Sequence, residues 1–336
     1  NNKQLKGAQL SGIMTTTNSL NGAQVSGVVS LANDAKGAQI AGVISASNTM
    51  NGIQLSGSVG IANTMKGIQI SGGVNAANQL NGFQISGGPS IANKVDGGQI
   101  SGGVSVANTL KGIQVSGGAS VAMDTSSGIQ ISGGANFAKE SFTGIQISPI
   151  NYAKRMKGIQ IGIFNITDSL DGYSIGILNY NKSGRNHINL YSNSNGLGGI
   201  SFQNAGKRIG WEYGLFQAYN NKYPVQGVMS AIGAKVYLGP FKSEAKLIPY
   251  LGARYYQPLN WNEASKKTLF SAEAGFAYQS GKWVTSVSYI ATGLVRYNSS
   301  ESLKQSYPFG SIQHLRERNF MSWGAVQLGI AYQIKG

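Results

Sequence analysis

Cysteine is absent from the 336-residue chain, and histidine occurs only twice. Without cysteine, neither a disulfide framework nor a thiolate metal site can form. The chain also contains no run of about eighteen apolar residues, the least that a membrane-crossing helix requires. The sequence therefore predicts no transmembrane helix. The first residues, Asn1-Asn2, include no methionine, which indicates a removed leader or a trimmed terminus.

Aromatic and acidic residues are few and unevenly placed. Residues 1–150 contain only three aromatics, whereas all four tryptophans fall after residue 210. Residues 1–181 carry ten Lys/Arg against six Asp/Glu (10 − 6 = +4), and residues 182–336 carry seventeen against six (17 − 6 = +11). This contrast predicts two domains with different surroundings, residues 1–181 and residues 182–336.

The excess of positive charge does not indicate nucleic-acid binding. The pI is about 9.8, but the basic residues are scattered through predicted strands and loops, with no known nucleic-acid-binding motif. We therefore expect no nucleic-acid partner.

Residue patterns typical of catalysis are missing as well. His187 and His314 are isolated and have no metal-ligand spacing. The sequence has no nucleophile elbow of the Gly-x-Ser-x-Gly type and no phosphate-binding loop. We predict no catalytic, cofactor or metal site and a protein that is not an enzyme. A hydrolase that uses a Ser–His pair on the second domain is the enzymatic alternative.

The first domain repeats one phrase, glycine-apolar-Gln-apolar. It occurs eleven times between Gly7 and Gly158, nearly always at a spacing of fifteen residues, and a degenerate copy begins at Gly172. Such a short, fixed period is typical of repeat architectures, in which each unit is stable only when stacked on its neighbours.

Each repeat alternates with period two, as a β-strand does. In the copy from Lys66, apolar side chains fall at Ile68, Ile70, Val74, Ala76 and Leu80, with Gln69, Ser71, Asn75 and Ala77 between them. Two structures fit. In a β-solenoid, each repeat is one coil, the apolar residues fill a thin core, and Gln and Asn stack on their equivalents about 4.8 Å away. In the alternative, each repeat is a membrane strand, and the whole chain is one large antiparallel barrel wall.

Three features favour the solenoid. Pro89 and Pro149 would lie within strands of a barrel wall, where a lost N–H is costly. Gly-Gly pairs such as 72–73 and 102–103 belong in turns. The fourteen-residue copy at Gly158 lacks one residue near the Gly-Gly position, and in a continuous strand this deletion would exchange the two faces. The alternation of Lys and Asn before the repeat glycines fits both structures.

The Gln and Asn rows have two interpretations. The simpler one is that they hold the stack together through amide hydrogen bonds. The functional one is that they form a regular polar face for a repetitive ligand such as a glycan.

The second domain contains longer amphipathic strands. One face is apolar and aromatic, and the other combines glycine with the charged residues Glu212, Lys235, Arg254 and Glu273. This pattern is typical of a small outer-membrane β-barrel, although a soluble lipocalin-like barrel or sandwich shares it. We predict about eight strands, namely His187–Tyr191, Gly198–Phe202, Ile209–Ala218, Val225–Leu238, Lys246–Tyr256, Leu269–Gln279, Trp283–Arg296 and Met321–Ile334.

Two further predictions concern this domain. The four charged residues form a charge-paired interior that plugs the barrel rather than conducting. Residues 298–318 form a long polar loop, whose basic end, His314-Leu315-Arg316-Glu317-Arg318, is either an ordinary solvated segment or a contact for lipopolysaccharide phosphates.

The repeats also resemble a known family. The runs Gly158-Ile159-Gln160-Ile161-Gly162-Ile163-Phe164-Asn165-Ile166 and Asp171-Gly172-Tyr173-Ser174-Ile175-Gly176-Ile177-Leu178-Asn179 are similar to the "surface repeat" proteins of Gram-negative bacteria, built on Gly-x-Gln-Ile-Gly-x-x-Asn units. The resemblance covers roughly residues 6–190 and implies a cell-envelope location, but no site residues. The chain differs from the family in using Ser-Gly-Gly where the family has Gly-Leu-Ile/Val.

The sequence thus predicts an all-β protein, a fifteen-residue-repeat solenoid followed by an antiparallel outer-membrane-type barrel. The expected function is that of a non-enzymatic outer-membrane or cell-surface structural protein, adhesin-like, with the repeats as scaffold. Its expected partners are outer-membrane lipid or lipopolysaccharide. The alternative function is that of a porin-like barrel for transport. Both functions are compatible with a homo-oligomer.

Overall fold

The computed structural model describes residues 2–206, 209–219, 225–238, 247–259, 267–297, 311–315 and 318–334. They form two compact units, Asn1–Tyr180 and Asn181–Gly336, which we call the repeat unit and the barrel unit. Every regular element among the described residues is a β-strand, as predicted. No helix long and apolar enough to cross a membrane is found in these ranges.

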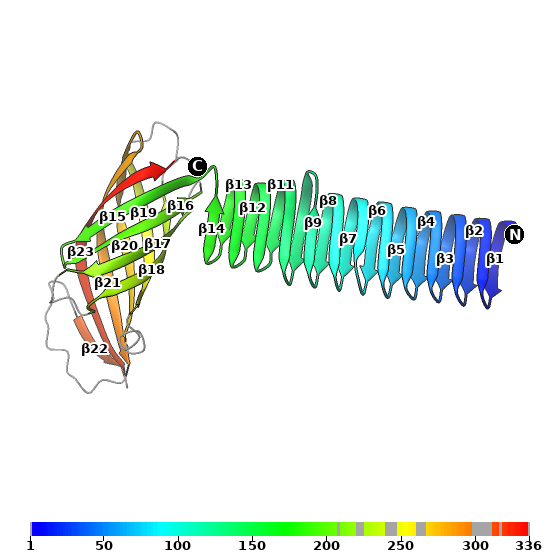
Figure 1. Ribbon diagram of the computed structural model, residues 1–336, viewed down its shortest axis with the longest axis horizontal. Helices are drawn as coiled ribbons and strands as arrows, with labels where there is room; N and C mark the ends of the chain where they lie inside the picture. Colours follow the sequence, from blue (N-terminus) through cyan, green and yellow to red (C-terminus); the bar gives the residue numbers. More distant parts are fainter. Residues whose placement is uncertain are drawn as a thin grey trace. The chain divides into compact units, whose positions relative to one another are not determined.

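The repeat unit is a stack of coils, each drawn as one or two bent strands (Figure 1). Its strands are β1 (Asn2–Ser11), β2 (Met14–Ser26), β3 (Val29–Ala41), β4 (Ile44–Ser56), β5 (Val59–Ser71), β6 (Val74–Ser86), β7 (Ser90–Ser101), β8 (Val104–Ser116), β9 (Ala119–Ala122), β10 (Ser126–Ser132), β11 (Ala135–Ile147), β12 (Ile150–Ile161), β13 (Phe164–Ile175) and β14 (Leu178–Asn181).

Neighbouring coils pair in parallel and in register. Between β5 and β6, for example, Gly67 lies opposite Gly82 and Gln69 lies opposite Gln84. Parallel pairing at one full repeat is the geometry of a solenoid, whereas a barrel wall built from consecutive strands would be antiparallel. The predicted solenoid is therefore confirmed, and the alternative of a single large barrel wall is wrong.

The turn features have the predicted locations. Pro89 lies between β6 and β7, Pro149 lies between β11 and β12, and the Gly-Gly pairs lie in the same turn of successive coils. The missing residue of the fourteen-residue copy at Gly158 also falls in this turn, because Ile163 alone connects Gly162 to Phe164 where most earlier coils have two residues. A turn absorbs this change without exchanging the faces of the strands.

The prediction of an apolar core is wrong for half of each coil. Gln69, Ser71 and Asn75 are buried, whereas Ile68 is 39% exposed on the outer surface. Alternation shows which residues share a face, but not which face is inside. Leu80 is nevertheless inside, because the corner at Asn78-Gln79 shifts the phase of the alternation.

A ladder of glutamine side chains runs through the core. Gln54 donates from Nε2 to Gln39 Oε1 at 2.8 Å and to the carbonyl of Ile61 across the core at 3.1 Å, and its Oε1 accepts from Gln69 Nε2 at 2.7 Å. Neighbouring coils are spaced as parallel strands are, so the side-chain amide of each glutamine reaches that of the next coil. The glutamine amides are therefore hydrogen-bonded although they are buried. The interpretation that glutamine holds the stack together is confirmed.

The glycan-binding interpretation of the glutamine row is wrong. Ten glutamines of the ladder have no exposed surface, so none can contact a ligand: Gln24, Gln39, Gln54, Gln69, Gln84, Gln99, Gln114, Gln130, Gln146 and Gln160. The part of the asparagine row that lies at the coil corner stays exposed and makes its own ladder, with Asn93 donating to Asn78 at 3.0 Å.

The rest of the core is apolar and lies beside the corner. Here alanines such as Ala62 and Ala107 pack against larger residues such as Met65 and Leu110. Each coil therefore has a polar inner half next to the Ser-Gly-Gly turn and an apolar inner half next to the corner.

Replacing Gln114 by leucine tests the ladder. The variant leaves Gln130 Nε2 without its acceptor and Gln99 Oε1 with one donor fewer, and each orphaned buried group costs about 1–3 kcal/mol. We expect faster hydrogen exchange of the β7, β8 and β10 amides. Gln79→Leu is the matched control, because Gln79 is exposed at a corner. Equal exchange in the two variants would contradict a stabilising ladder.

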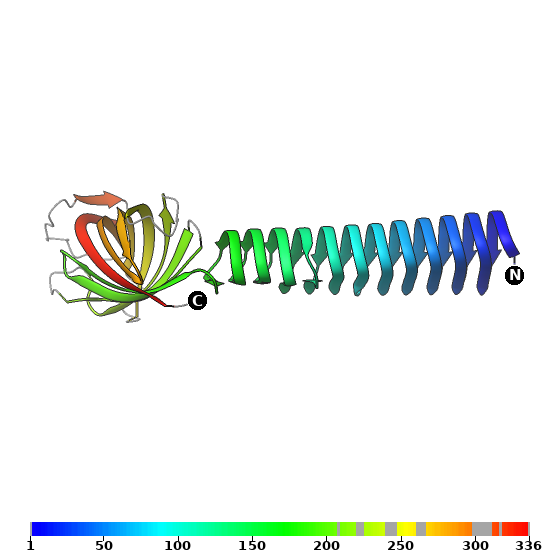
Figure 2. The ribbon, with the colours of Figure 1, turned by 90° about the horizontal axis from the view of Figure 1, so that it is seen from above.

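The barrel unit is a closed antiparallel barrel of eight strands, with the first strand paired to the last (Figure 2). The strands are β15 (Arg185–Asn193), β16 (Leu197–Ala205), β17 (Ile209–Ala218), β18 (Val228–Tyr237), β19 (Leu247–Pro258), β20 (Lys267–Ser280), β21 (Trp283–Tyr297) and β23 (Arg318–Ile334). The number of strands and their approximate positions match the prediction.

One short strand was not predicted. β22 (Ser311–Leu315) pairs with β23, so part of the expected polar loop is β-structure. Of the basic end of this loop, Arg316 and Glu317 lie outside the described residues.

Candidate functional site: the interior and outer wall of the barrel

Four charged side chains meet inside the barrel, one from each of β17, β18, β19 and β20. Glu212, Lys235, Arg254 and Glu273 are 1–4% exposed. Each cation lies close to both carboxylates: Lys235 Nζ is 3.6 Å from Glu212 and 3.5 Å from Glu273, and the Arg254 guanidinium is 3.1 Å and 3.2 Å from the same two groups. The predicted charge-paired interior is confirmed, and the cluster has no net charge. We call it the ion cluster.

Glycines make room for the ion cluster. Gly233 pairs with both Glu212 and Arg254, and Gly252 pairs with both Lys235 and Glu273. A Cβ on Gly252 would lie 2.6 Å from a carboxylate oxygen of Glu273. The alternation of glycine and charge along these strands is therefore a packing requirement.

Polar and aromatic groups surround the ion cluster. Tyr191 accepts a hydrogen bond from Lys235 Nζ at 2.7 Å, and its ring lies 4.7 Å from the Arg254 guanidinium carbon. Gln327 accepts from Arg254 at 3.3 Å and donates to Glu273 at 3.1 Å. These contacts satisfy most of the hydrogen-bonding capacity that buried charges retain after pairing.

Apolar side chains fill the barrel toward one end. This cluster consists of Tyr191, Leu197, Phe216, Ala218, Val225, Met229, Ala231, Tyr256, Leu269, Leu294, Met321 and Trp323. Several of its members flank the connections 194–196, 219–227, 259–266 and 298–317, so we call this end the loop end. The opposite end, the turn end, has the connections 206–208, 238–246 and 281–282.

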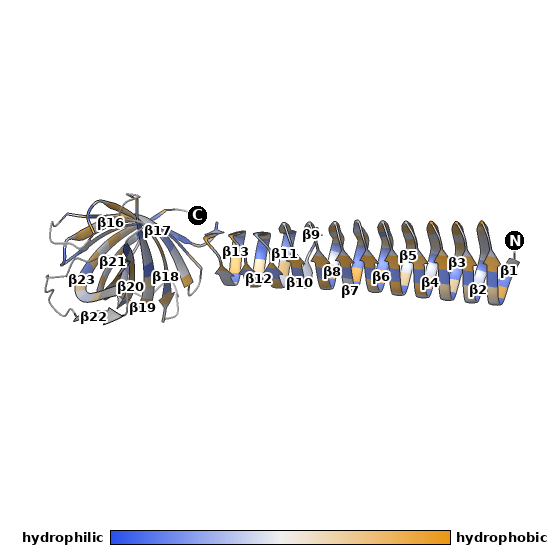
Figure 3. Cartoon of the chain, turned by 90° about the horizontal axis from the view of Figure 1, so that it is seen from below, coloured by the Kyte–Doolittle hydropathy of each residue, from blue (hydrophilic) through white to orange (hydrophobic). Residues whose placement is uncertain are grey.

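The outer wall is apolar. Large exposed side chains alternate with inward-facing residues on every strand of the barrel, for example Leu215, Leu251, Phe276 and Val287. Figure 3 shows hydrophobic and hydrophilic bands alternating along the strands. Apolar residues outside and polar residues inside are the arrangement of a membrane barrel and the reverse of a soluble one.

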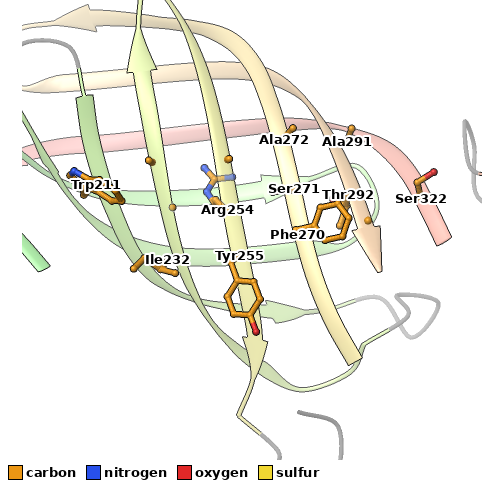
Figure 4. A pocket seen from close by; sticks show the side chains of 14 residues that line it. Trp211, Ile232, Arg254, Tyr255, Phe270, Ser271, Ala272, Ala291, Thr292 and Ser322 are labelled. Carbon is orange, nitrogen blue, oxygen red and sulfur yellow. The ribbon is translucent and has the colours of Figure 1, made fainter. Parts of the chain in front are cut away.

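A hollow interrupts this wall. Ala234, Ala253, Ala272 and Ala291 lie side by side on consecutive strands β18 to β21. Larger outward residues of the neighbouring positions, including Trp211 and the residues Ile232, Tyr255 and Phe270, border the row (Figure 4). The hollow has a volume of about 700 Å³ and an almost wholly apolar lining.

The structure describes the side chain of one of the two histidines. His187 is buried inside the barrel on β15, with neither ring nitrogen hydrogen-bonded. The backbone of His314 is in β22, but its side chain lies outside the described residues. Across the part of the chain that the structure describes, no group of three His, Asp or Glu side chains could hold a metal ion.

Sequence reasoning identified the four charges but missed Tyr191 and Gln327, which complete the cluster. Both come from β15 and β23, the strands that close the barrel. Inward-facing polar residues are common, and only the barrel closure shows that these two reach the charges. The hollow could have been noticed, since one small outward residue occurs on each of four consecutive strands.

Comparisons with known proteins give two structural likenesses. No family model and no curated protein matches the chain. The N-terminal β-barrel domain of Pseudomonas aeruginosa OprF is similar at 15% identity and a TM-score of 0.29, over 46% of this chain and 98% of that one. Neisserial surface protein A is similar at 16% identity and a TM-score of 0.26, over 45% of this chain and 94% of that one.

Proposed function

We propose that the protein is a non-enzymatic structural component of the outer membrane, anchored by a barrel that does not conduct. The observation that carries this proposal is the polarity of the barrel unit, a neutral ion cluster inside and large apolar side chains outside. In water this arrangement would expose a continuous apolar surface, which soluble proteins avoid. In a membrane the apolar outer face contacts hydrocarbon, and the polar groups of the inner face bond to one another away from it.

The strand lengths support this environment. The barrel strands have nine to seventeen residues, and about nine to eleven tilted residues suffice to cross a bilayer. The hydrogen-bonding groups along each strand are paired with neighbours on both sides because the barrel is closed.

The connections indicate an orientation. In outer-membrane barrels the short turns face the periplasm and the long loops face outward. The turn end has the connections 206–208, 238–246 and 281–282, and the longest connection of the barrel, 298–317, is at the loop end. β15 begins and β23 ends at the turn end, so the chain enters and leaves the barrel on the side that we assign to the periplasm. This favours an envelope scaffold over an adhesin.

Two assays test the proposal. We expect the refolded protein to float with phospholipid vesicles and to migrate differently on gels with and without heating. We also expect no conductance in planar bilayers, because the ion cluster and the aromatic residues around it occupy the lumen. Steady single-channel steps would support the porin-like alternative instead, and a chain that stays soluble without detergent would rule out both functions.

A further inference from the structure

The charges of the repeat unit are confined to one edge of the stack. Between Gly7 and Asn181, every Lys, Arg, Asp and Glu lies in the short corner segments, of which residues 33–36, 63–66 and 108–111 are examples. None of these charged side chains is buried. We call this side the charged edge. The opposite side, formed by the Ser-Gly-Gly turns and their equivalents, carries no charge, and we call it the neutral edge.

The surface between the two edges is aliphatic. Rows of isoleucine and phenylalanine run along the stack, with exposed fractions of 45% for Ile53, 39% for Ile68, 43% for Phe83 and 43% for Ile100. Figure 3 shows these hydrophobic bands repeating from coil to coil. Soluble monomers usually expose no contiguous apolar patch larger than a few hundred Å², and apolar rows that continue from coil to coil are typical of a surface that meets a membrane or a partner.

The interior changes polarity along the same direction. Beside the charged edge the core is apolar, as at Ala77 and Leu80, which is the arrangement of a protein in water. Beside the neutral edge the core is polar, as at Ser71 and Asn75, and aliphatic residues are outside, which is the arrangement of a membrane barrel. One coil therefore combines both arrangements.

The neutral edge also satisfies the main condition for entering hydrocarbon, that backbone groups are hydrogen-bonded internally. Its turns bond from coil to coil: Gly72 N–H donates to the carbonyl of Ser56 at 3.3 Å, and Gly73 N–H donates to that of Ser58 at 3.0 Å. The serine side chains that flank a turn on the strands, such as Ser101 and Ser105, point inward and share a hydrogen bond of 2.9 Å.

We propose that the repeat unit lies on a phospholipid membrane, with its neutral edge and adjoining aliphatic faces immersed in the acyl chains of one leaflet and its charged edge in water. The dimensions agree. One side of a coil, such as residues 73–77, spans about 16 Å at ~3.3 Å per residue. Half of the hydrocarbon core is about 15 Å thick. A protein partner could cover one face, but lipid covers both faces and the edge between them.

The natural absence of cysteine allows a test with the full-length chain. Ser58→Cys places a fluorescent label on the neutral edge, and Lys66→Cys places it on the charged edge of the same repeat; both positions are exposed. The labelled proteins are reconstituted in vesicles of phosphatidylethanolamine and phosphatidylglycerol, in which some acyl chains carry a nitroxide. We expect the label at position 58 to lose most of its emission to the nitroxide, and the label at position 66 to respond only to iodide in the water.

Two substitutions by lysine make this test more specific. In the Ser58→Cys background, Val43→Lys adds a charge to the neutral edge and should reduce nitroxide quenching. Thr49→Lys adds the same charge to the charged edge and should leave the quenching unchanged.

Two results would overturn the inference. One is quenching of the label at position 58 by iodide but not by nitroxide lipid, which means that the edge is in water. The other is protection from both quenchers together with self-association in sedimentation, which means that another protein molecule covers it. Heat-modifiable migration of the same samples reports barrel insertion separately, so failure of this inference is distinguishable from failure of the proposed anchor.

Discussion

Replacing Arg254 by methionine should destabilise the barrel by about 3–5 kcal/mol, the usual cost of breaking a buried ion pair from one side. The guanidinium lies 3.1 Å from Glu212 and 3.2 Å from Glu273. Without it, Lys235 alone faces two carboxylates, and the interior gains one uncompensated negative charge. Urea unfolding from lipid vesicles, followed by the gel shift, measures the loss.

Two further variants give this prediction its controls. Lys282→Met removes one positive charge from an exposed turn and should leave the free energy of unfolding nearly unchanged. The fourfold variant Glu212→Gln, Lys235→Met, Arg254→Met and Glu273→Gln removes all the charges and should recover much of the stability, since no buried charge lacks a partner. If Arg254→Met unfolds at the same urea concentration as the natural sequence, the ion cluster does not stabilise the fold.

Replacing Gly112 by alanine should be the most disruptive small change in the repeat unit. Gly112 has a φ of +140°, and an added Cβ would lie 1.8 Å from the carbonyl oxygen of Gly97 in the preceding coil. Backbone strain of this kind alone costs about 1–3 kcal/mol, and the overlap can be relieved only by separating two coils. We expect a loss of more than about 2 kcal/mol, with hydrogen exchange accelerating most in β7, β8 and β10.

The chain itself supplies a control for this prediction. Gly103 occupies a turn position that carries Val28, Val43 or Ser58 in other coils, and its φ is not in the left-handed region. Gly103→Ser should therefore change exchange little. Equal protection of the amides in Gly112→Ala and Gly103→Ser would show that the first glycine of the repeat is not required by backbone geometry.

The fold of the repeat unit could be predicted from the sequence, but the face of each strand that is buried could not. Pro89, Pro149 and the Gly-Gly pairs indicated a turn in every repeat, and the parallel register confirms it. The sequence did not show which face of the strand is buried. Alternation places Gln69 and Ile68 on opposite faces, but it does not distinguish the inner face from the outer one. Only the ladder geometry, in which each amide reaches the next coil, shows that glutamine can be buried without loss.

For the barrel, the four charges were predictable and their partners were not. Glu212, Lys235 and Arg254 stood out because charged residues on an amphipathic strand are rare and share a face with glycine. Tyr191 and Gln327 reach them from strands that are distant in sequence. Their role depends on which two strands pair to close the barrel, and no local sequence pattern shows this pairing.

The central claim is that the apolar outer wall of the barrel faces lipid and that its interior does not. The most direct test of this claim uses two tryptophans of the barrel. Trp211 borders the hollow in the outer wall, whereas Trp323 is 2% exposed and packs inside. Variants that retain only one of these tryptophans, reconstituted with phospholipids brominated along the acyl chain, report contact with hydrocarbon. We predict strong quenching of Trp211 and little quenching of Trp323. Quenching of Trp323 with Trp211 unaffected would show that the apolar face is not the one in lipid.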